Sequence, residues 1–293
     1  MIDSPMLSGL AVLLGLAATV VCLYGWRRLR DTTLAAPCAW SAASLAAATG
    51  AVIWELALPA TPSTPHLDYL AATTSVAPFV ALLGAKRPQN RAWQWIVLSL
   101  VGLLALQDLR GWSINPAASP SLHTAWRWLL AGIVLAQCVN YLPTRHAPAA
   151  AFACAGQASM LAGNLPFLSE RSTWSFSAGL GLSSAAVLTA ALIVRRTRRT
   201  SDGWQDAWLD FRNAYGVLWS LRVAERVNAL ALEQQCPLRL NWYGVVQAED
   251  ADASSAEASA GEHTASLYRI LRSVVARFVS AEWLAARGAN VAS

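Results

Sequence analysis

The sequence has few charged residues, and this scarcity is informative. Only 13% of its 293 residues are Asp, Glu, Lys or Arg, whereas 55% are hydrophobic. A soluble domain usually carries about 25% charged residues. Low charge together with several long apolar runs is typical of multi-pass membrane proteins. The composition therefore predicts a chain that lies largely in the lipid bilayer.

Other residues and motifs are also scarce, and each absence excludes a class of protein. The single lysine, Lys86, lies between two apolar segments, which excludes a retinal Schiff base inside a helix bundle. The five cysteines form no CxxC, and four of them lie within apolar segments, which argues against a disulfide framework. We find no phosphate-binding glycine loop, no metal-spaced cysteine–histidine cluster and no serine–histidine–acid arrangement. These patterns predict no metal site and give no support for enzymatic chemistry.

Seven apolar segments occur before residue 199. Their approximate ranges are 6–26, 34–58, 67–85, 92–107, 122–142, 147–165 and 173–194. A helix needs about 20 apolar residues to cross a hydrocarbon core of roughly 30 Å. We therefore expect an all-α membrane protein in which residues 1–199 form a seven-transmembrane-helix bundle. The sixth segment is the weakest, because it is short and contains Gln157 and Asn164.

Basic residues are distributed unequally between alternate loops, which predicts the orientation of the bundle. One set of loops contains eleven: Arg27, Arg28, Arg30, Lys86, Arg87, Arg91, Arg145, Arg195, Arg196, Arg198 and Arg199. The opposite set contains three: Arg110, Arg127 and Arg171. Cytoplasmic loops are enriched in Lys and Arg, so we expect the N-terminus outside and the C-terminus in the cytoplasm. The N-terminus lacks the basic region of a signal peptide, so we expect an uncleaved first helix in the inner (plasma) membrane.

Two local patterns predict how these helices pack and bend. Small residues four positions apart let helix backbones approach closely, although an alanine-rich chain also produces this spacing by chance. They occur as Ala43, Ala47 and Ala51, as Gly179 with Ser183, and as Ser177 with Gly181. Pro78 should kink the third helix. The carbonyl that it frees needs a partner, which we expect within one turn, at Thr73, Thr74 or Ser75.

The pattern changes to that of a soluble segment after residue 199. Apolar residues recur every three to five positions in a helix predicted over 202–235. A short strand follows at 238–246, and the acidic, serine-rich stretch 248–263 is predicted to be a disordered linker. A last amphipathic helix covers 264–287. The sequence thus predicts a small, mainly helical cytoplasmic tail.

The predicted tail is thin and carries an aromatic stripe. Trp204, Trp208, Phe211 and Tyr215 recur along its first helix and are candidates for contact with a partner or with the membrane interface. Two helices and one strand bury little, so we expect help from the membrane surface, a second copy or a partner chain. A cytoplasmic helical hairpin is the alternative to a helix in the interface. The net charge of +5 does not indicate nucleic-acid binding, because the arginines lie at helix ends.

Two histidines begin apolar segments on the predicted outer side. These are His66 and His123, and His123 lies in the tryptophan-containing stretch DLRGWSINPAASPSLHTAWRW. This stretch resembles the external tryptophan-rich segment of haem-handling proteins of cytochrome c assembly. The resemblance implies haem as a cofactor and the two histidines as its ligands. The alternative is that the tryptophans anchor the interface and the histidines are solvated.

Polar residues within the apolar segments give a further set of candidates. Glu55 lies near the outer end of the second segment, and an ionisable group in the bilayer is by default a candidate for proton or ion handling. Gln137, Asn140 and Gln157 lie on the fifth and sixth segments. Such amides either form hydrogen bonds between helices or line the path of a polar solute.

Two further stretches carry a resemblance. The loop GAKRPQNRAWQW, residues 84–95, and WLDFRNAYGVLWSLRVAERVN, residues 208–228, are similar to a family of bacterial multi-pass membrane proteins without an assigned activity. This resemblance implies membrane location but no chemistry. We therefore expect a non-enzymatic scaffold, assembly factor or sensor whose tail binds a partner. The alternative is a protein that handles haem or a small solute.

Overall fold

The computed structural model describes residues 5–58, 61, 64–86, 89–114, 122–168, 175–196, 203–247 and 260–289. The chain forms two compact units. The first holds Met1–Ala85 and Gln89–Arg196, and the second holds Thr197–Ser293. The division lies three residues before the predicted start of the tail.

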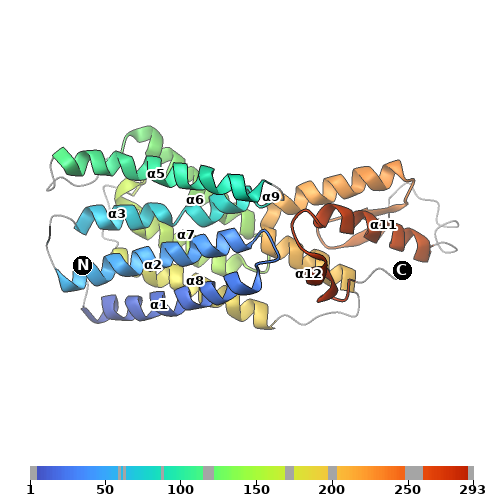
Figure 1. The fold of residues 1–293 in the computed structure, drawn as a ribbon, viewed down its shortest axis with the longest axis horizontal. Helices are drawn as coiled ribbons and strands as arrows, with labels where there is room; N and C mark the ends of the chain where they lie inside the picture. The colour runs from blue at the N-terminus through green and yellow to red at the C-terminus, as the bar shows by residue number, and fades with distance from the viewer. Residues whose placement is uncertain are drawn as a thin grey trace. The chain divides into compact units, whose positions relative to one another are not determined.

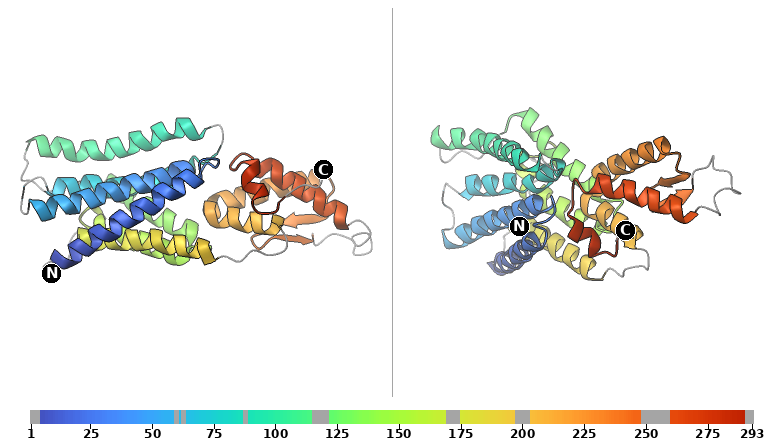
Figure 2. Two further views of the ribbon diagram at one scale, coloured as in Figure 1. Left: turned by 60° about the horizontal axis from the view of Figure 1, so that its bottom comes forward. Right: turned by 45° about the vertical axis from the view of Figure 1, so that its right-hand side comes forward.

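The first unit is entirely helical in its described residues (Figure 1). Its elements are α1 (Pro5–Arg28), α2 (Ala35–Ala57), α3 (Thr64–Thr74), α4 (Ala77–Leu83), α5 (Asn90–Ile114), α6 (Thr124–Tyr141), α7 (Ala147–Met160), the short 3₁₀ turn η1 (Ala162–Asn164) and α8 (Phe176–Arg196). The long helices lie alongside one another (Figures 1 and 2). α1 packs against α2 and α8, α3 packs against α2 and α5, and α7 packs against α6 and α8. Each predicted apolar segment therefore contains helix.

Five stretches of helix are long and apolar enough to cross a membrane within the described residues. They are Pro5–Arg28, Ala35–Ala57, Thr64–Leu83, Asn90–Leu109 and Phe176–Arg196. The third of these comprises α3 and α4 together. The shorter α6 and α7, with 18 and 14 residues, are not among them. The protein is thus an all-helical membrane-type bundle with five such helices, and the seven-span arrangement stays a prediction.

The third span is broken at Pro78, as its sequence predicts, but the freed carbonyl is satisfied differently. Proline has no N–H to donate to the carbonyl four residues earlier, that of Thr74. The Thr73 and Thr74 hydroxyls do not reach it, because they donate to Leu70 O and Ala71 O. Instead, Ser44 on α2 donates its hydroxyl to Thr74 O at 2.6 Å. The predicted partner within the same turn is therefore wrong, and a neighbouring helix supplies it.

Small residues bring α7 and α8 into close contact. A Cβ added to Gly156 would lie 2.8 Å from Gly179 O and from Ser183 N, so only glycine fits there. The predicted Gly179–Ser183 face is therefore used, whereas a Cβ at Gly181 would meet nothing within 4 Å.

The predicted small-residue face of α2 is largely wrong. Ala43 and Ala47 are exposed, and of the three alanines only Ala51 is buried. α2 buries a neighbouring face instead: Ala42, Leu45, Ala48 and Val52. The larger Leu45 and Val52 can fill space against α1 and α8 that alanine would leave empty.

The second unit contains α9 (Gly203–Glu233), β1 (Leu238–Leu240), β2 (Val245–Gln247), α11 (Ala260–Val275) and α12 (Ala281–Ala285). α9 is not the single helix predicted over 202–235. Gly216 has φ of 74° and breaks it into two, because that backbone conformation favours glycine. The helix predicted over 264–287 is likewise two helices, α11 and α12, since the chain turns between Val275 and Ala281.

The predicted single strand is in fact a hairpin. Leu238–Leu240 pairs antiparallel with Val245–Gln247. Asn241 closes the turn, since its side-chain oxygen accepts hydrogen bonds from the N–H groups of Tyr243 and Gly244. The strand therefore finds its partner within the same segment. Most of the predicted linker, 248–259, lies outside the described residues, and 260–263 form the first turn of α11.

Candidate functional site

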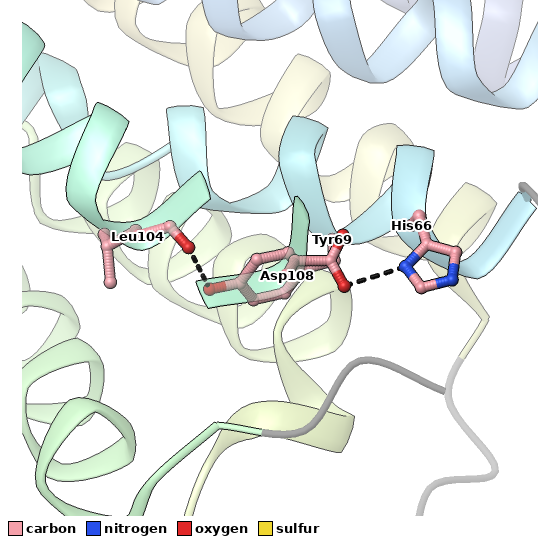
Figure 3. A network of polar contacts seen from close by, with 4 residues as sticks. All are labelled: His66, Tyr69, Leu104 and Asp108. Carbon is pink, nitrogen blue, oxygen red and sulfur yellow. Dashed lines mark hydrogen bonds and ion pairs between the residues drawn. The ribbon is translucent and has the colours of Figure 1, made fainter. Parts of the chain in front are cut away.

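A histidine and an aspartate meet between α3 and α5. The Nδ1 atom of His66 lies 2.8 Å from the Oδ1 atom of Asp108, and each side chain is only 1% exposed (Figure 3). His66 lies in the first turn of α3, and Asp108 lies in the last two turns of α5. The apolar composition of both segments makes them helical and packs them together, and this packing buries the two polar side chains.

Neighbouring aromatic residues hold this pair in place. Tyr69, one turn after His66, donates its hydroxyl to Leu104 O at 2.9 Å, one turn before Asp108 (Figure 3). Trp112, one turn after Asp108, stacks on the His66 ring with centroids 5.1 Å apart and planes 6° from parallel. Residues four apart on a helix share a face, so three successive turns of α5 point toward α3.

The pair lies in segments that can cross a membrane. His66 belongs to the span Thr64–Leu83, and Asp108 belongs to the span Asn90–Leu109. A buried carboxylate costs several kcal/mol unless it is paired, and His66 supplies the partner. The Asp108 Oδ2 atom is buried and has no hydrogen-bond partner among the described residues. Chemically, the pair can bind and release a proton.

A second polar cluster lies at the break between α3 and α4. The amide nitrogen of Gln157, on α7, donates to Ser75 O at 2.6 Å and to the Gln137 side-chain oxygen at 3.2 Å. Gln157 and Ser75 are buried, and Gln137 is half-buried. The structure therefore brings together two of the three amides that the sequence singled out.

The remaining predicted residues of the membrane segments lie apart from these contacts. His123 is exposed and caps α6, where its Nδ1 accepts a hydrogen bond from the Ala125 N–H. Asn140 is buried near the end of α6, and Glu55 is half-buried near the end of α2. Because His66 is enclosed by Asp108 and Trp112 while His123 caps another helix, the geometry does not support a haem held between these two histidines.

The four aromatic residues predicted as a tail surface lie in the core of the second unit. Trp208, Phe211 and Tyr215 are almost fully buried, and Trp204 is 7% exposed. Phe278 packs edge-on against Phe211 and Tyr215, while Tyr268 stacks on Trp204. The tail thus buries this stripe with its own later residues.

Asp108 is the residue of the first site that the sequence candidates did not include. Its signal was its level: His66 begins one helix on the predicted outer side, and Asp108 ends the next helix on that side. The described residues contain no group of three or more His, Cys, Asp or Glu side chains that could hold a metal ion. Comparisons with protein-family models, curated proteins and solved structures give no match.

Proposed function

We propose that this chain is a bacterial inner-membrane protein that handles protons at the His66–Asp108 pair. In this proposal the first unit crosses the membrane seven times, with the N-terminus outside and the second unit in the cytoplasm. The asymmetry of basic residues supports that orientation.

The observation that carries the proposal is the burial of this ion-forming pair between two apolar helices. Ionisable side chains within membrane segments are expensive to bury and often mark proton relays and ion pathways. His66 and Asp108 share hydrogen-bonding atoms, so a proton bound by either one changes their contact directly. The adjacent Trp112 ring would report such a change.

Histidine-selective ¹⁵N NMR of the full-length protein in lipid nanodiscs tests the proposal. The chain has four histidines, so the His66→Gln variant assigns the His66 signals, and exposed His123 serves as an internal reference. We expect the His66 signals to change with pH, and to change differently in Asp108→Asn, which keeps an acceptor oxygen but cannot ionise. A folded protein whose His66 keeps one protonation state throughout the accessible pH range would contradict proton handling.

The second unit favours a second candidate function, the recruitment of a partner or of a second copy of the chain. Although the aromatic stripe is buried, Leu221 and Leu232 on α9 are 54% and 66% exposed. Light scattering and mass spectrometry of the purified protein test this idea. We expect a dimer or a stoichiometric partner that the Leu221→Glu, Leu232→Glu double variant loses, and a bare monomer would contradict it.

A further inference from the structure

The first unit contains the same three-helix pattern twice, 112 residues apart. α2 begins at Ala35 and α7 at Ala147, while α3 begins at Thr64 and α8 at Phe176. α1 and α6 end at Arg28 and Tyr141, within one residue of this spacing. α5 stands between the two groups. The first repeat is thus α1 to α4, and the second repeat is α6 to α8.

The loops between the first two helices of each repeat have the same hydrogen bonds. The Thr32 hydroxyl donates to Leu29 O at 2.9 Å and accepts from the Leu34 N–H at 3.3 Å. The Thr144 hydroxyl donates to Tyr141 O at 2.7 Å and accepts from the His146 N–H at 3.1 Å. Each atom pair in the second loop lies 112 residues after its counterpart in the first loop. This agreement is specific to loop geometry and does not follow from helix length.

Thiol contacts between the same helices repeat with this spacing. The Cys38 thiol donates to Cys22 O at 3.1 Å, and the Cys154 thiol donates to Val134 O at 3.7 Å. The two accepting carbonyls are again 112 residues apart. Neighbouring helices of the bundle alternate in direction, so repeats separated by one helix run parallel. In membrane proteins with internal repeats, solute sites lie at the interface between the repeats, commonly where a helix is broken.

The Gln157 cluster joins the two repeats at such a break. Gln157 belongs to the second repeat, and it donates to the carbonyl of Ser75 in the first. Both side chains retain buried atoms, Gln157 Oε1 and Ser75 Oγ, with no hydrogen-bond partner within the described ranges. Buried polar atoms of this kind indicate a bound water or solute.

The equivalent positions show that packing does not require this cluster. Leu45 corresponds to Gln157, Val187 corresponds to Ser75, and Ala190 corresponds to Pro78. Leu45 is buried in an apolar core, and α8 continues unbroken past Val187 and Ala190. The same pattern of helices therefore forms with apolar residues at all three positions, and only one of the two copies has become polar.

We propose that the α3–α4 break is a site through which a small uncharged solute bearing hydroxyl or amide groups passes between the two repeats. Gln157 Oε1 accepts a hydrogen bond from the solute, and Ser75 Oγ donates or accepts a second one. These groups are neutral, so they compensate a neutral solute for lost water but do not compensate an ion. The site lies nine residues after His66 on the broken third span, and it does not depend on proton handling there.

Stopped-flow light scattering of liposomes containing the full-length protein tests the site, with glycerol and urea as probes. We expect several-fold faster uptake of at least one probe than in protein-free liposomes. Gln157→Leu and Ser75→Ala should each reduce uptake to the protein-free rate. Ser159→Ala is the matched control, because Ser159 is also buried on α7 but donates to Ser175 O.

Three outcomes would overturn the proposal. Uptake of both probes at the protein-free rate excludes passage of such solutes. Faster movement of water alone shows that the cluster holds only water. Unchanged uptake in a folded Ser75→Ala or Gln157→Leu variant removes these residues from the path. Circular dichroism of each variant establishes folding, and Ser75→Ala, which deletes a single hydroxyl, serves where Gln157→Leu does not fold.

Discussion

A buried ionisable side chain costs free energy unless another group compensates it, and His66 and Asp108 do this for one another. Their side chains are both 1% exposed, so neither has water as a substitute partner. The same dependence holds for the polar atoms at the α3–α4 break, where Gln157 supplies the donor for Ser75 O. At the scale of single residues, the polar groups of the first unit are organised by pairs on different helices.

This pairing predicts a non-additive effect of substitutions. Asp108→Leu alone should lower the free energy of unfolding by about 3–5 kcal/mol, because it leaves a buried histidine without its partner. Adding His66→Leu should recover much of that loss, because no polar group is then left unpaired. Thermal or denaturant unfolding in detergent, arranged as a double-mutant cycle, measures the coupling. Additive losses would show that the two side chains do not stabilise one another.

At the scale of elements, the third span depends on its neighbour to tolerate a proline. Pro78 removes the donor that would bond to Thr74 O, and Ser44 on α2 replaces it. Because the donor comes from another helix, the break and the packing of α2 against α3 are one feature. The second unit shows a comparable dependence, since the break at Gly216 lets both halves of α9 pack into one core.

The replacement of one donor by another can be measured. Ser44→Ala should destabilise the protein by about 1–3 kcal/mol, because Thr74 O is then left buried and unpaired. In a Pro78→Ala background the same substitution should cost less, since the alanine introduced there has an N–H that can bond to Thr74 O. Unfolding of the four proteins in detergent gives the comparison. Equal costs of Ser44→Ala in both backgrounds would mean that the two donors do not serve the same carbonyl.

At the scale of the whole molecule, five helices can span a membrane, and the crossing of α6 and α7 decides whether there are seven. The loop between them contains Pro143 and Arg145. If both helices cross, this loop is cytoplasmic. If neither crosses, it lies outside. The termini lie on opposite sides in either case, so fusions at the ends do not distinguish the two arrangements.

Labelling of single cysteines in intact cells resolves this question. In a variant without the five native cysteines, Pro143→Cys should react with an impermeant maleimide only after the cells are permeabilised. Thr61→Cys, between α2 and α3, is the control that should react in intact cells. Labelling of Pro143→Cys in intact cells would place its loop outside and support five spans.

Sequence alone identified what depends on local chemistry. Long apolar runs predicted the helices of the first unit, and Pro78 predicted the break in the third span because a missing N–H needs no tertiary context. The spacing of aromatic residues predicted an apolar face on α9. That spacing did not say what covers the face, which is Phe278 and Tyr268 from later in the chain.

Tertiary structure decided which groups meet. The pairing of His66 with Asp108, of Ser44 with Thr74 O and of Gln157 with Ser75 O joins residues 30 to 82 positions apart. Helical periodicity places each side chain on a face of its own helix, but the rotation and neighbours of that helix follow from the packing of the whole bundle. For this reason composition and periodicity determined the kind of protein, whereas packing determined its candidate sites.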